Sequence, residues 1–406
     1  MITHESPLDV GIVGGGIGGL AAAAFLLQAG IRATVYEQAP ELTEVGAGLI
    51  IAPNAARLLR RMGSIETFTR TAVKLDTGWE FRRWQDGTVL SSEDLAARCQ
   101  ELFGEETYAA HRADLLDAVK SAVAPESLRL GMKCTALDTS GPRPVLTFEN
   151  GQTHAHDLVI GADGIHSPVR QHLWGSGSAQ FSGLSAFRAL VPADVAPEFS
   201  KRRAQVLWLG PGRHLVHYPV SSGRYINLVA FAPAGEFRAE SWTATATRDE
   251  FHAEFAEWDP RIGALINQAE RIGRWALLDR PPLTAWSTDR VTLLGDAAHP
   301  MFPFFAQGAA QSMEDAAVLA LALAANHDDP AAGLQEYERI RLPRTTQIQL
   351  ASHDRAATNH LPDGAEQLAR DERLGSLDPL AANGWIYSYD PSRAFAEQKS
   401  SGQATA

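Results

Sequence analysis

Residues 10–19, Val-Gly-Ile-Val-Gly-Gly-Gly-Ile-Gly-Gly, decide the fold of this chain. They begin with a short apolar strand over residues 10–13 and continue through a glycine-rich turn into an Ala- and Leu-rich helix over residues 17–28. Gly30 is placed to end that helix, and residues 31–36 form a second apolar strand. The pattern predicts a βαβ unit at the start of an α/β protein.

The glycines of this turn have the spacing GxGxxG, which binds dinucleotides when it lies between a strand and a helix. The turn brings the backbone close to a pyrophosphate at the helix N-terminus. Glu37 ends the second strand 23 positions after Gly14, where a ribose 2′-hydroxyl needs an acceptor and a 2′-phosphate would be repelled. The site therefore predicts FAD or NAD rather than NADP. Its expected contacts are Gly14, Gly16, Ile17, Gly19, Glu37 and Gln38.

Composition excludes several other classes of protein. The 406 residues are 45% hydrophobic and 21% charged, as in an ordinary folded protein, and the net charge of −12 argues against nucleic acid as a partner. Two cysteines are too few for a disulfide framework or a thiolate metal cage, and no paired histidine spacing indicates a metal. The longest apolar run, residues 316–325, is about half a membrane span. We expect a cytoplasmic protein without metal or membrane contact, as a monomer or homodimer.

The order of predicted elements indicates two interleaved domains followed by helices. Residues 205–209, 214–220 and 225–231 alternate as an antiparallel meander with Gly-containing turns, and residues 145–149 and 158–160 are predicted to flank an Asn-Gly hairpin turn. We expect a Rossmann-like FAD-binding domain, an interleaved antiparallel-sheet substrate domain and C-terminal helices. The predicted boundaries are 1–75, 100–175 and 282–345 for the first domain, 76–99 and 176–281 for the second, 346–395 for a C-terminal helical segment, and 396–406 for a disordered tail.

Two further motifs favour FAD over NAD. Residues 163–170 have the form DGxxSxxR, and residues 295–300, Gly-Asp-Ala-Ala-His-Pro, stand between a predicted strand and a predicted helix. With GxGxxG, their order and spacing resemble the single-component FAD-dependent aromatic hydroxylases, the group A flavoprotein monooxygenases. Shorter matches resemble salicylate hydroxylases and 6-hydroxynicotinate 3-monooxygenases in particular: residues 45–48, 53–54, 61–63, 111–115, 306–309, 313–316 and 385–390.

The resemblance implies bound FAD, transient NADH or NADPH, and molecular oxygen. The sequence does not encode the choice of nicotinamide legibly, and we expect NADH. It implies that a flavin C4a-hydroperoxide hydroxylates a small aromatic ring. Further FAD contacts implied by the family are Gly46, Ala47, Arg112, Asp163, Asp296, Pro300, Gly308 and Ala309. Asp163 could instead serve only its Asp-Gly turn, and Arg112 could be a surface arginine at a helix start. Tyr337, Arg341 and Arg344 also match the family, and we expect them to tie a long helix to the flavin domain without a chemical role.

Catalytic candidates come from the meander. His214, Val216 and Tyr218 share one face of their strand. The resemblance makes this face the roof over the flavin, with Tyr218 as partner of a phenol or carboxylate and His214 as proton-handling or anchoring group. Both could instead be satisfied sheet residues. Further predicted pocket residues are Ile50, Gln205, Val216, Tyr225 and Phe304.

The substrate pocket is predicted to be apolar. Ile50 and Phe304 stand where pyridine hydroxylases of the family carry polar side chains, which favours a phenol or hydroxybenzoate, because an unpartnered buried ring nitrogen costs about 1–3 kcal/mol. Decarboxylation is not readable from the side chains. His299 is expected to shape the turn after residue 298 rather than to act in catalysis. Two alternatives stay open: an FAD-dependent oxidoreductase that inserts no oxygen, and a dinucleotide-binding protein without activity.

Overall fold

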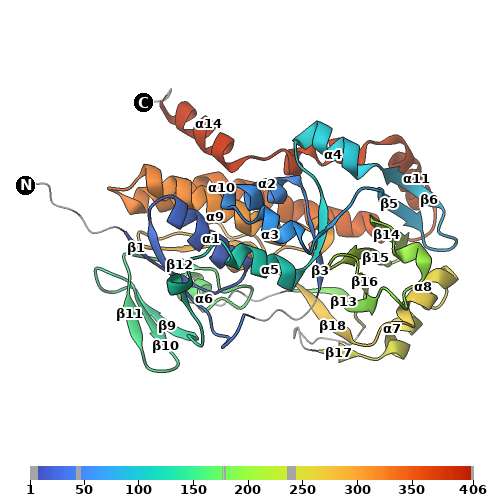
Figure 1. Cartoon of the computed structure of the whole chain (residues 1–406), viewed down its shortest axis with the longest axis horizontal. Coiled ribbons are helices and arrows are strands. Elements are labelled where there is room, and N and C mark those ends of the chain that lie inside the picture. The colour runs from blue at the N-terminus through green and yellow to red at the C-terminus, as the bar shows by residue number, and fades with distance from the viewer. Residues whose placement is uncertain (1–7, 43–46, 176, 178–179, 236–243, 404–406) are drawn as a thin grey trace, which may run out of the picture.

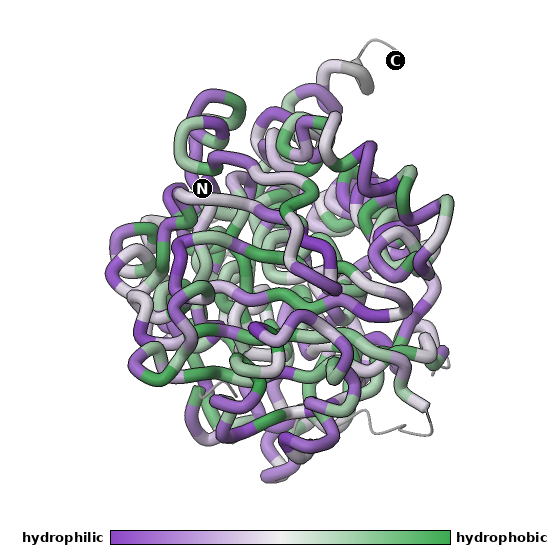
Figure 2. Tube along the Cα trace, turned by 90° about the vertical axis from the view of Figure 1, so that its right-hand side faces the viewer, coloured by the Kyte–Doolittle hydropathy of each residue, from purple (hydrophilic) through white to green (hydrophobic). Residues whose placement is uncertain are grey.

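The computed structural model describes residues 8–42, 47–175, 177, 180–235 and 244–403. It has two lobes, each built on one large sheet, and helices α9 and α10 pack side by side (Figure 1). The end of α10 reaches the second lobe, where His360 contacts His214. Hydrophobic segments run through the interior while hydrophilic residues gather on the outer turns (Figure 2). Helix α9 spans Gly308–Ala325 and α10 spans Pro330–Asn359. The predicted fold class, with a Rossmann-like part and an interleaved antiparallel sheet, is confirmed.

The first lobe holds a five-stranded parallel sheet in the order β19-β12-β1-β2-β8. Its central strand, β1, is buried, with α1 packed on the sheet and α9 packed against α1, and this burial explains why β1 reads as a continuous apolar run. The predicted βαβ unit is present as β1, α1 and β2. The elements are β1 (Asp9–Val13), α1 (Ile17–Gln28), β2 (Arg32–Tyr36), β8 (Leu128–Arg129), β12 (Leu158–Gly161) and β19 (Val291–Leu293).

A three-stranded antiparallel sheet extends this lobe and corrects one prediction. Strand β10 (Val145–Phe148) turns at Gly151, whose φ of 82° is left-handed, and pairs with β11 (Thr153–Ala155) and β9 (Cys134–Asp138). The Asn-Gly turn therefore does not join β10 to the strand at 158–160. That strand is β12 of the parallel sheet, because its fully buried apolar residues need cover on both faces.

The second lobe is an eight-stranded sheet in the order β17-β18-β13-β16-β15-β14-β5-β6. Every neighbouring pair is antiparallel except β14 with β5. The predicted meander is β14 to β16, and the long strand β13 was not predicted. The strands are β5 (Gly78–Arg83), β6 (Val89–Glu93), β13 (Gln180–Pro192), β14 (Ala204–Gly210), β15 (Arg213–Val220), β16 (Tyr225–Pro233), β17 (Thr245–Ala246) and β18 (Ile272–Asp279).

A small antiparallel sheet and the remaining helices complete the fold. The small sheet has β3 (Gly48–Ile51), β7 (Tyr108–His111) and β4 (Val73–Lys74). Short 3-10 turns cover Pro125–Ser127, Glu198–Ser200, Gly295–Ala297 and Pro303–Phe305. The helices are α2 (Pro53–Met62), α3 (Ile65–Thr69), α4 (Leu95–Phe103), α5 (Arg112–Lys120), α6 (Pro168–Trp174), α7 (Arg248–Glu254), α8 (Pro260–Ile266), α11 (Ala365–Ser376), α12 (Pro379–Ala382), α13 (Gly384–Tyr387) and α14 (Pro391–Gln403).

Helix α14 differs from the prediction of a disordered tail from residue 396. The chain is helical to Gln403, because Phe395 packs on the core of the first lobe and Arg393 pairs with Glu397 one turn later. Residues 404–406 lie outside the described part. No helix among the described residues is long and apolar enough to cross a bilayer.

Candidate active site

A nucleotide cleft of about 380 Å³ opens at the end of β1, in front of the N-terminus of α1. A Cβ atom on Gly14 would lie 2.3 Å from the Ala162 carbonyl oxygen, and one on Gly19 would lie 2.0 Å from the Gly14 carbonyl oxygen. A Cβ on Gly16 would meet no atom within 4 Å. Gly14 and Gly19 therefore allow the close packing of strand and helix, whereas the space over Gly16 is left for a ligand.

Glu37 closes the side of this cleft. Its Oε2 accepts a hydrogen bond from the Gly15 amide at 2.7 Å, and its Oε1 accepts one from the Ala39 amide at 2.8 Å. These bonds hold the carboxylate at the end of β2, where it also lines the cleft. The position is the one that the sequence predicts for a ribose acceptor.

Asp163 lines the cleft and also stabilises the start of α6. Its Oδ2 accepts from the Val169 amide at 3.1 Å, and its Oδ1 accepts from the Ser167 hydroxyl. Burial raises the pKa of Asp163, and the bonds to Ser167 and Val169 oppose that rise. Both carboxylate oxygens thus have protein partners, as in the turn-forming interpretation of the Asp-Gly motif.

A second cavity, the ring cavity, continues from the nucleotide cleft and encloses about 210 Å³ between the lobes. The two cavities share Arg112, Asp296 and the first residues of α9, Gly308 and Ala309. The walls of the ring cavity are largely apolar, with Trp79, Phe81, Phe231, Phe304, Phe305 and Tyr387 among the aromatic ones. The predicted residues Ala47, Ile50, Gln205, Val216 and Phe304 also line it.

One wall of the ring cavity is the face of β15 that carries His214, Val216 and Tyr218. Burial raises the pKa of Tyr218, and Arg188 opposes that rise only in part. Burial lowers the pKa of His214 well below its usual value, and His360 lowers it further. The wall therefore presents a protonated phenol and a neutral imidazole.

His214 has a partner from the end of α10. Its Nδ1 lies 2.6 Å from Nε2 of His360, and its ring stacks on Phe231 with 4.5 Å between centroids. Burial lowers the pKa of His360 to about 4, and Arg213 also lowers it. Two neutral imidazoles share one proton in this contact, because one nitrogen must donate and the other accept.

Three predicted site residues are placed elsewhere, and a fourth lies outside the described residues. Tyr225 is 38% exposed and lines a neighbouring cavity of about 960 Å³, because it is the first residue of β16 and lies at the end of that strand. Pro300 lines neither cavity, and its carbonyl accepts a hydrogen bond from Gln349 Nε2 at 2.8 Å. Gly19 packs against Gly14 instead of facing the cleft. Gly46 lies outside the described residues.

Several cavity residues were missed by the sequence reasoning. Arg188 comes from β13, and Arg355 and Asn359 come from α10. Arg188 lies over the ring of Trp275 at 4.4 Å, and burial lowers its pKa to about 10. Nothing around these residues resembles a motif. The one available signal was the four-residue spacing of Arg355 and Asn359, which puts both on one face of a helix.

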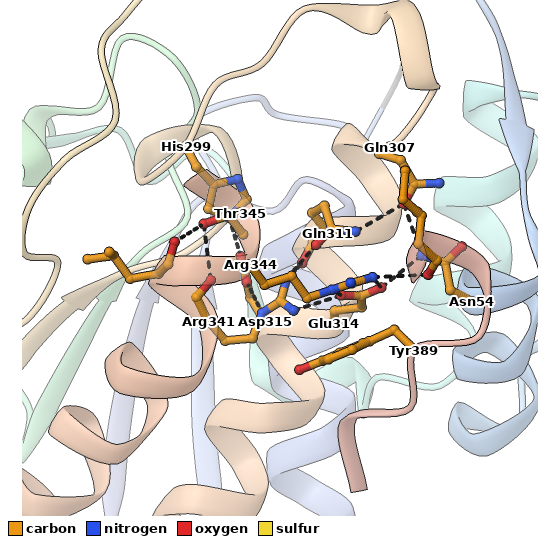
Figure 3. A network of polar contacts seen from close by, with 12 residues as sticks. Asn54, His299, Gln307, Gln311, Glu314, Asp315, Arg341, Arg344, Thr345 and Tyr389 are labelled. Atoms are coloured by element: carbon orange, nitrogen blue, oxygen red, sulfur yellow. Dashed lines mark hydrogen bonds and ion pairs between the residues drawn. The ribbon is translucent and has the colours of Figure 1, made fainter. Parts of the chain in front are cut away.

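A buried polar network behind the ring cavity joins α9 to α10 (Figure 3). Arg341 donates from Nη1 to Glu314 and from Nε to Asp315, both at 2.7 Å, and all three side chains are fully buried. Arg344 also binds Glu314 and lies over the ring of Tyr389 at 3.7 Å. The predicted role of Arg341 and Arg344 in holding a long helix to the flavin lobe agrees with these contacts.

The same network fixes the turn that follows β19. His299 Nε2 lies 2.6 Å from Asp315 Oδ2, which also accepts from the Gly295 amide at 3.0 Å. Burial alone would raise the pKa of Asp315, but His299 and Arg341 outweigh it and lower the pKa to about 2. His299 thus shapes the turn from behind and lines neither cavity.

The geometry fits FAD. The first turn of α1 has no side-chain cap, so its amides face the cleft, and the N-terminus of α9 lies where the cleft meets the ring cavity. Both helix ends favour negative charge, and Arg112 adds a cation at the junction. One extended ligand can place its pyrophosphate at α1 and its ring system beside α9. Among the described residues, no group of three or more His, Cys, Asp or Glu side chains is arranged to hold a metal ion.

A nucleotide cleft that opens into a ring cavity at a second helix N-terminus defines a flavoprotein. The FAD binding domain family matches residues 7–352, and the chain belongs to this family. It is 40% identical over 389 residues to a 3-amino-4-hydroxybenzoate 2-monooxygenase of Streptomyces platensis, covering 96% of this chain and 98% of the relative. It is 34% identical over 359 residues to a 6-hydroxynicotinate 3-monooxygenase of Bordetella bronchiseptica, covering 87% of this chain and 93% of that protein.

The fold has the same relatives. A salicylate hydroxylase substrate complex superimposes with a TM-score of 0.81 at 26% identity, covering 96% of this chain and 98% of that one. The resemblance to salicylate hydroxylases and 6-hydroxynicotinate 3-monooxygenases is therefore confirmed. The chain is an FAD-dependent aromatic-ring monooxygenase.

Proposed function

We propose that this monooxygenase hydroxylates a hydroxybenzoate, with NADH or NADPH as transient reductant and Tyr218 and His214 as the groups that handle the substrate phenol. The observation that carries this proposal is the ring cavity. Its volume of about 210 Å³ is below the roughly 300–1,000 Å³ typical of sites for drug-sized ligands. Its aromatic and aliphatic walls suit a benzene ring, and its polar groups suit a phenol and an anion.

Bound FAD supplies the redox chemistry, in which oxygen is activated and one oxygen atom is transferred to the ring. The protein must bind and orient the substrate, exclude water and handle its phenolic proton. Arg112 and Asp296 stand where the flavin ring would meet the rest of the cofactor. The relative that acts on 3-amino-4-hydroxybenzoate is more similar to this chain than the one that acts on 6-hydroxynicotinate, which supports a benzenoid substrate.

The side chains of β15 that line the ring cavity would take up the phenolic proton of the substrate. Electrophilic hydroxylation is easier on a phenolate, so a base near the phenol oxygen speeds the reaction, typically by about 10²- to 10⁴-fold. With Nδ1 of His214 donating to His360, Nε2 of His214 is an acceptor for that proton. Tyr218 stays protonated and donates a hydrogen bond to the phenol oxygen or to another oxygen of the substrate.

The test is a substrate panel on the purified holoenzyme. NADH and NADPH oxidation, oxygen uptake and peroxide are measured with 2-, 3- and 4-hydroxybenzoate, 3-amino-4-hydroxybenzoate and 6-hydroxynicotinate. We expect stimulated turnover with little peroxide for at least one hydroxybenzoate and not for the pyridine. Release of carbon dioxide from 2-hydroxybenzoate reports decarboxylation. Stimulation by 6-hydroxynicotinate alone would refute the proposed substrate class.

A further inference from the structure

The charged side chains of the ring cavity are unevenly balanced. Arg112, Arg188 and Arg355 line it, whereas Asp296 is the one carboxylate among the described residues that line it. His214 contributes no charge, because burial keeps its imidazole neutral. The cavity therefore carries an excess of positive charge within apolar walls, an environment that stabilises a bound anion.

Two of the three arginines also line a second cavity. Arg112 and Asp296 also line the nucleotide cleft, at the junction that the flavin would occupy. Arg188 also lines the neighbouring outer cavity and is stacked over Trp275. Arg355 differs from both, because it lines the ring cavity alone.

Arg355 is a half-buried cation without a carboxylate partner. Its guanidinium carbon lies 4.6 Å from the ring centroid of Phe305, and its Nη2 makes one long hydrogen bond of 3.4 Å to Asn383 Oδ1. No ion pair within the described ranges includes it. Burial lowers the pKa of Arg355, and only the phenol of Tyr387 opposes this effect. Arg341, on the same helix, shows the contrast, since two carboxylates surround it.

Asn359 provides an independent observation on the same helix face. It follows Arg355 by one turn, lines the ring cavity and is only 3% exposed. Its side chain makes no hydrogen bond to any other residue that the structure describes. A buried amide normally has a partner, so Asn359 indicates a polar ligand atom at this end of the cavity.

We propose that Arg355, together with Asn359, is the anchor for the carboxylate of the aromatic substrate. The guanidinium is planar and can pair with both carboxylate oxygens, and the amide of Asn359 can donate to one of them. The proposal rests on the proposed function in one respect, that the cavity takes an aromatic ring. The new element is that residues of α10, and not of the sheet that carries His214 and Tyr218, make the enzyme prefer aromatic carboxylates to neutral phenols.

Binding is the direct test, because it does not depend on turnover. Holoenzyme loaded with FAD is titrated calorimetrically with 3-hydroxybenzoate and with its neutral analogue 3-hydroxybenzamide. For Arg355→Met we expect the Kd of the acid to rise about 10- to 100-fold, and the Kd of the amide to change less than about twofold. Arg355→Lys keeps the charge but loses the two-point contact, so we expect a loss of about three- to tenfold. Should Arg355→Met not fold, this second variant carries the test.

Arg339→Met is the matched control. Arg339 is exposed on the same helix, its one ion pair with a described residue is to Glu336, and it lines neither cavity, so both Kd values should stay at the wild-type value. An equal effect of Arg355→Met on acid and amide, or no effect on either, would overturn the anchor. Weakened binding of the acid alone, in an enzyme that hydroxylates no hydroxybenzoate, would keep the anchor and refute the proposed function instead.

Discussion

His214 on β15 and His360 at the end of α10 are joined through Nδ1 and Nε2 at 2.6 Å. The contact links the roof of the ring cavity to the C-terminal helices across 146 residues of sequence. It also fixes which nitrogen of His214 is left for the substrate. Because burial depresses the pKa of both rings, the pair stays neutral at physiological pH and can only take up a proton.

This pair predicts a loss of stability in mild acid. Both pKa values lie below the usual 6.5 of an unfolded histidine, so the unfolded chain binds protons that the folded chain does not. The Tm of the holoenzyme should therefore fall as the pH decreases from 6.5 towards 4. His360→Gln should fall less steeply, whereas His327→Gln, at an exposed site, should follow the wild type. Identical slopes for all three proteins would contradict the assignment.

Substitutions of the β15 residues that line the ring cavity should leave FAD binding intact but reduce the coupling of NAD(P)H oxidation to hydroxylation. For Tyr218→Phe we expect normal FAD content but about tenfold less hydroxylated product per NAD(P)H, with peroxide making up the difference. For His214→Gln we expect kcat/KM to fall by about 10²-fold or more. His217→Gln is the control, because His217 faces away from the cavity and packs on Phe199. If Tyr218→Phe forms as much product per NAD(P)H as the wild type, Tyr218 has only a structural role.

The glycines of the fingerprint should respond differently to substitution. Gly16 has extended backbone angles that any residue adopts, and the space above it is open, so Gly16→Leu should fold but purify without FAD. Gly19→Ala should instead lose about 1–3 kcal/mol or more of stability, since its Cβ would collide with the Gly14 carbonyl. Absorbance at 450 nm and thermal unfolding separate the two effects. Full FAD content in Gly16→Leu would contradict the placement of the pyrophosphate.

The network behind the cavity predicts a large effect on stability. Arg341→Met leaves the carboxylates of Glu314 and Asp315 buried without this partner, which should cost about 3–5 kcal/mol in denaturant unfolding. Arg339→Met, two positions earlier in α10, breaks only a surface pair and should change stability by about 0.5 kcal/mol or less. Similar midpoints for the two variants would show that the network does not hold α10 in place.

The sequence predicted the first lobe well because its signals are local. A strand, a glycine turn and a helix in direct succession determine the βαβ unit, and Glu37 follows at a fixed distance. The face shared by His214, Val216 and Tyr218 was also predictable, because side chains alternate along any strand. Tyr225 was misplaced because alternation does not tell which end of a strand reaches the cavity.

The rest of the site depends on contacts between distant segments. Arg355 and Asn359 reach the cavity, and His360 reaches His214, because Arg341 and Arg344 hold α10 against α9. No local pattern marks such a placement. The hairpin at residue 151 was misassigned for a related reason, since the partner of β12 is β1, nearly 150 residues earlier in the chain.

The most direct test of the account is transfer of one atom of molecular oxygen to the substrate. Holoenzyme is supplied with NADH or NADPH, the best hydroxybenzoate of the panel and ¹⁸O₂, and the product is analysed by mass spectrometry. The account predicts one ¹⁸O atom in the new ring hydroxyl and about one product per nucleotide oxidised. Substrate-stimulated nucleotide oxidation that yields only labelled peroxide, with the ring unchanged, would contradict it.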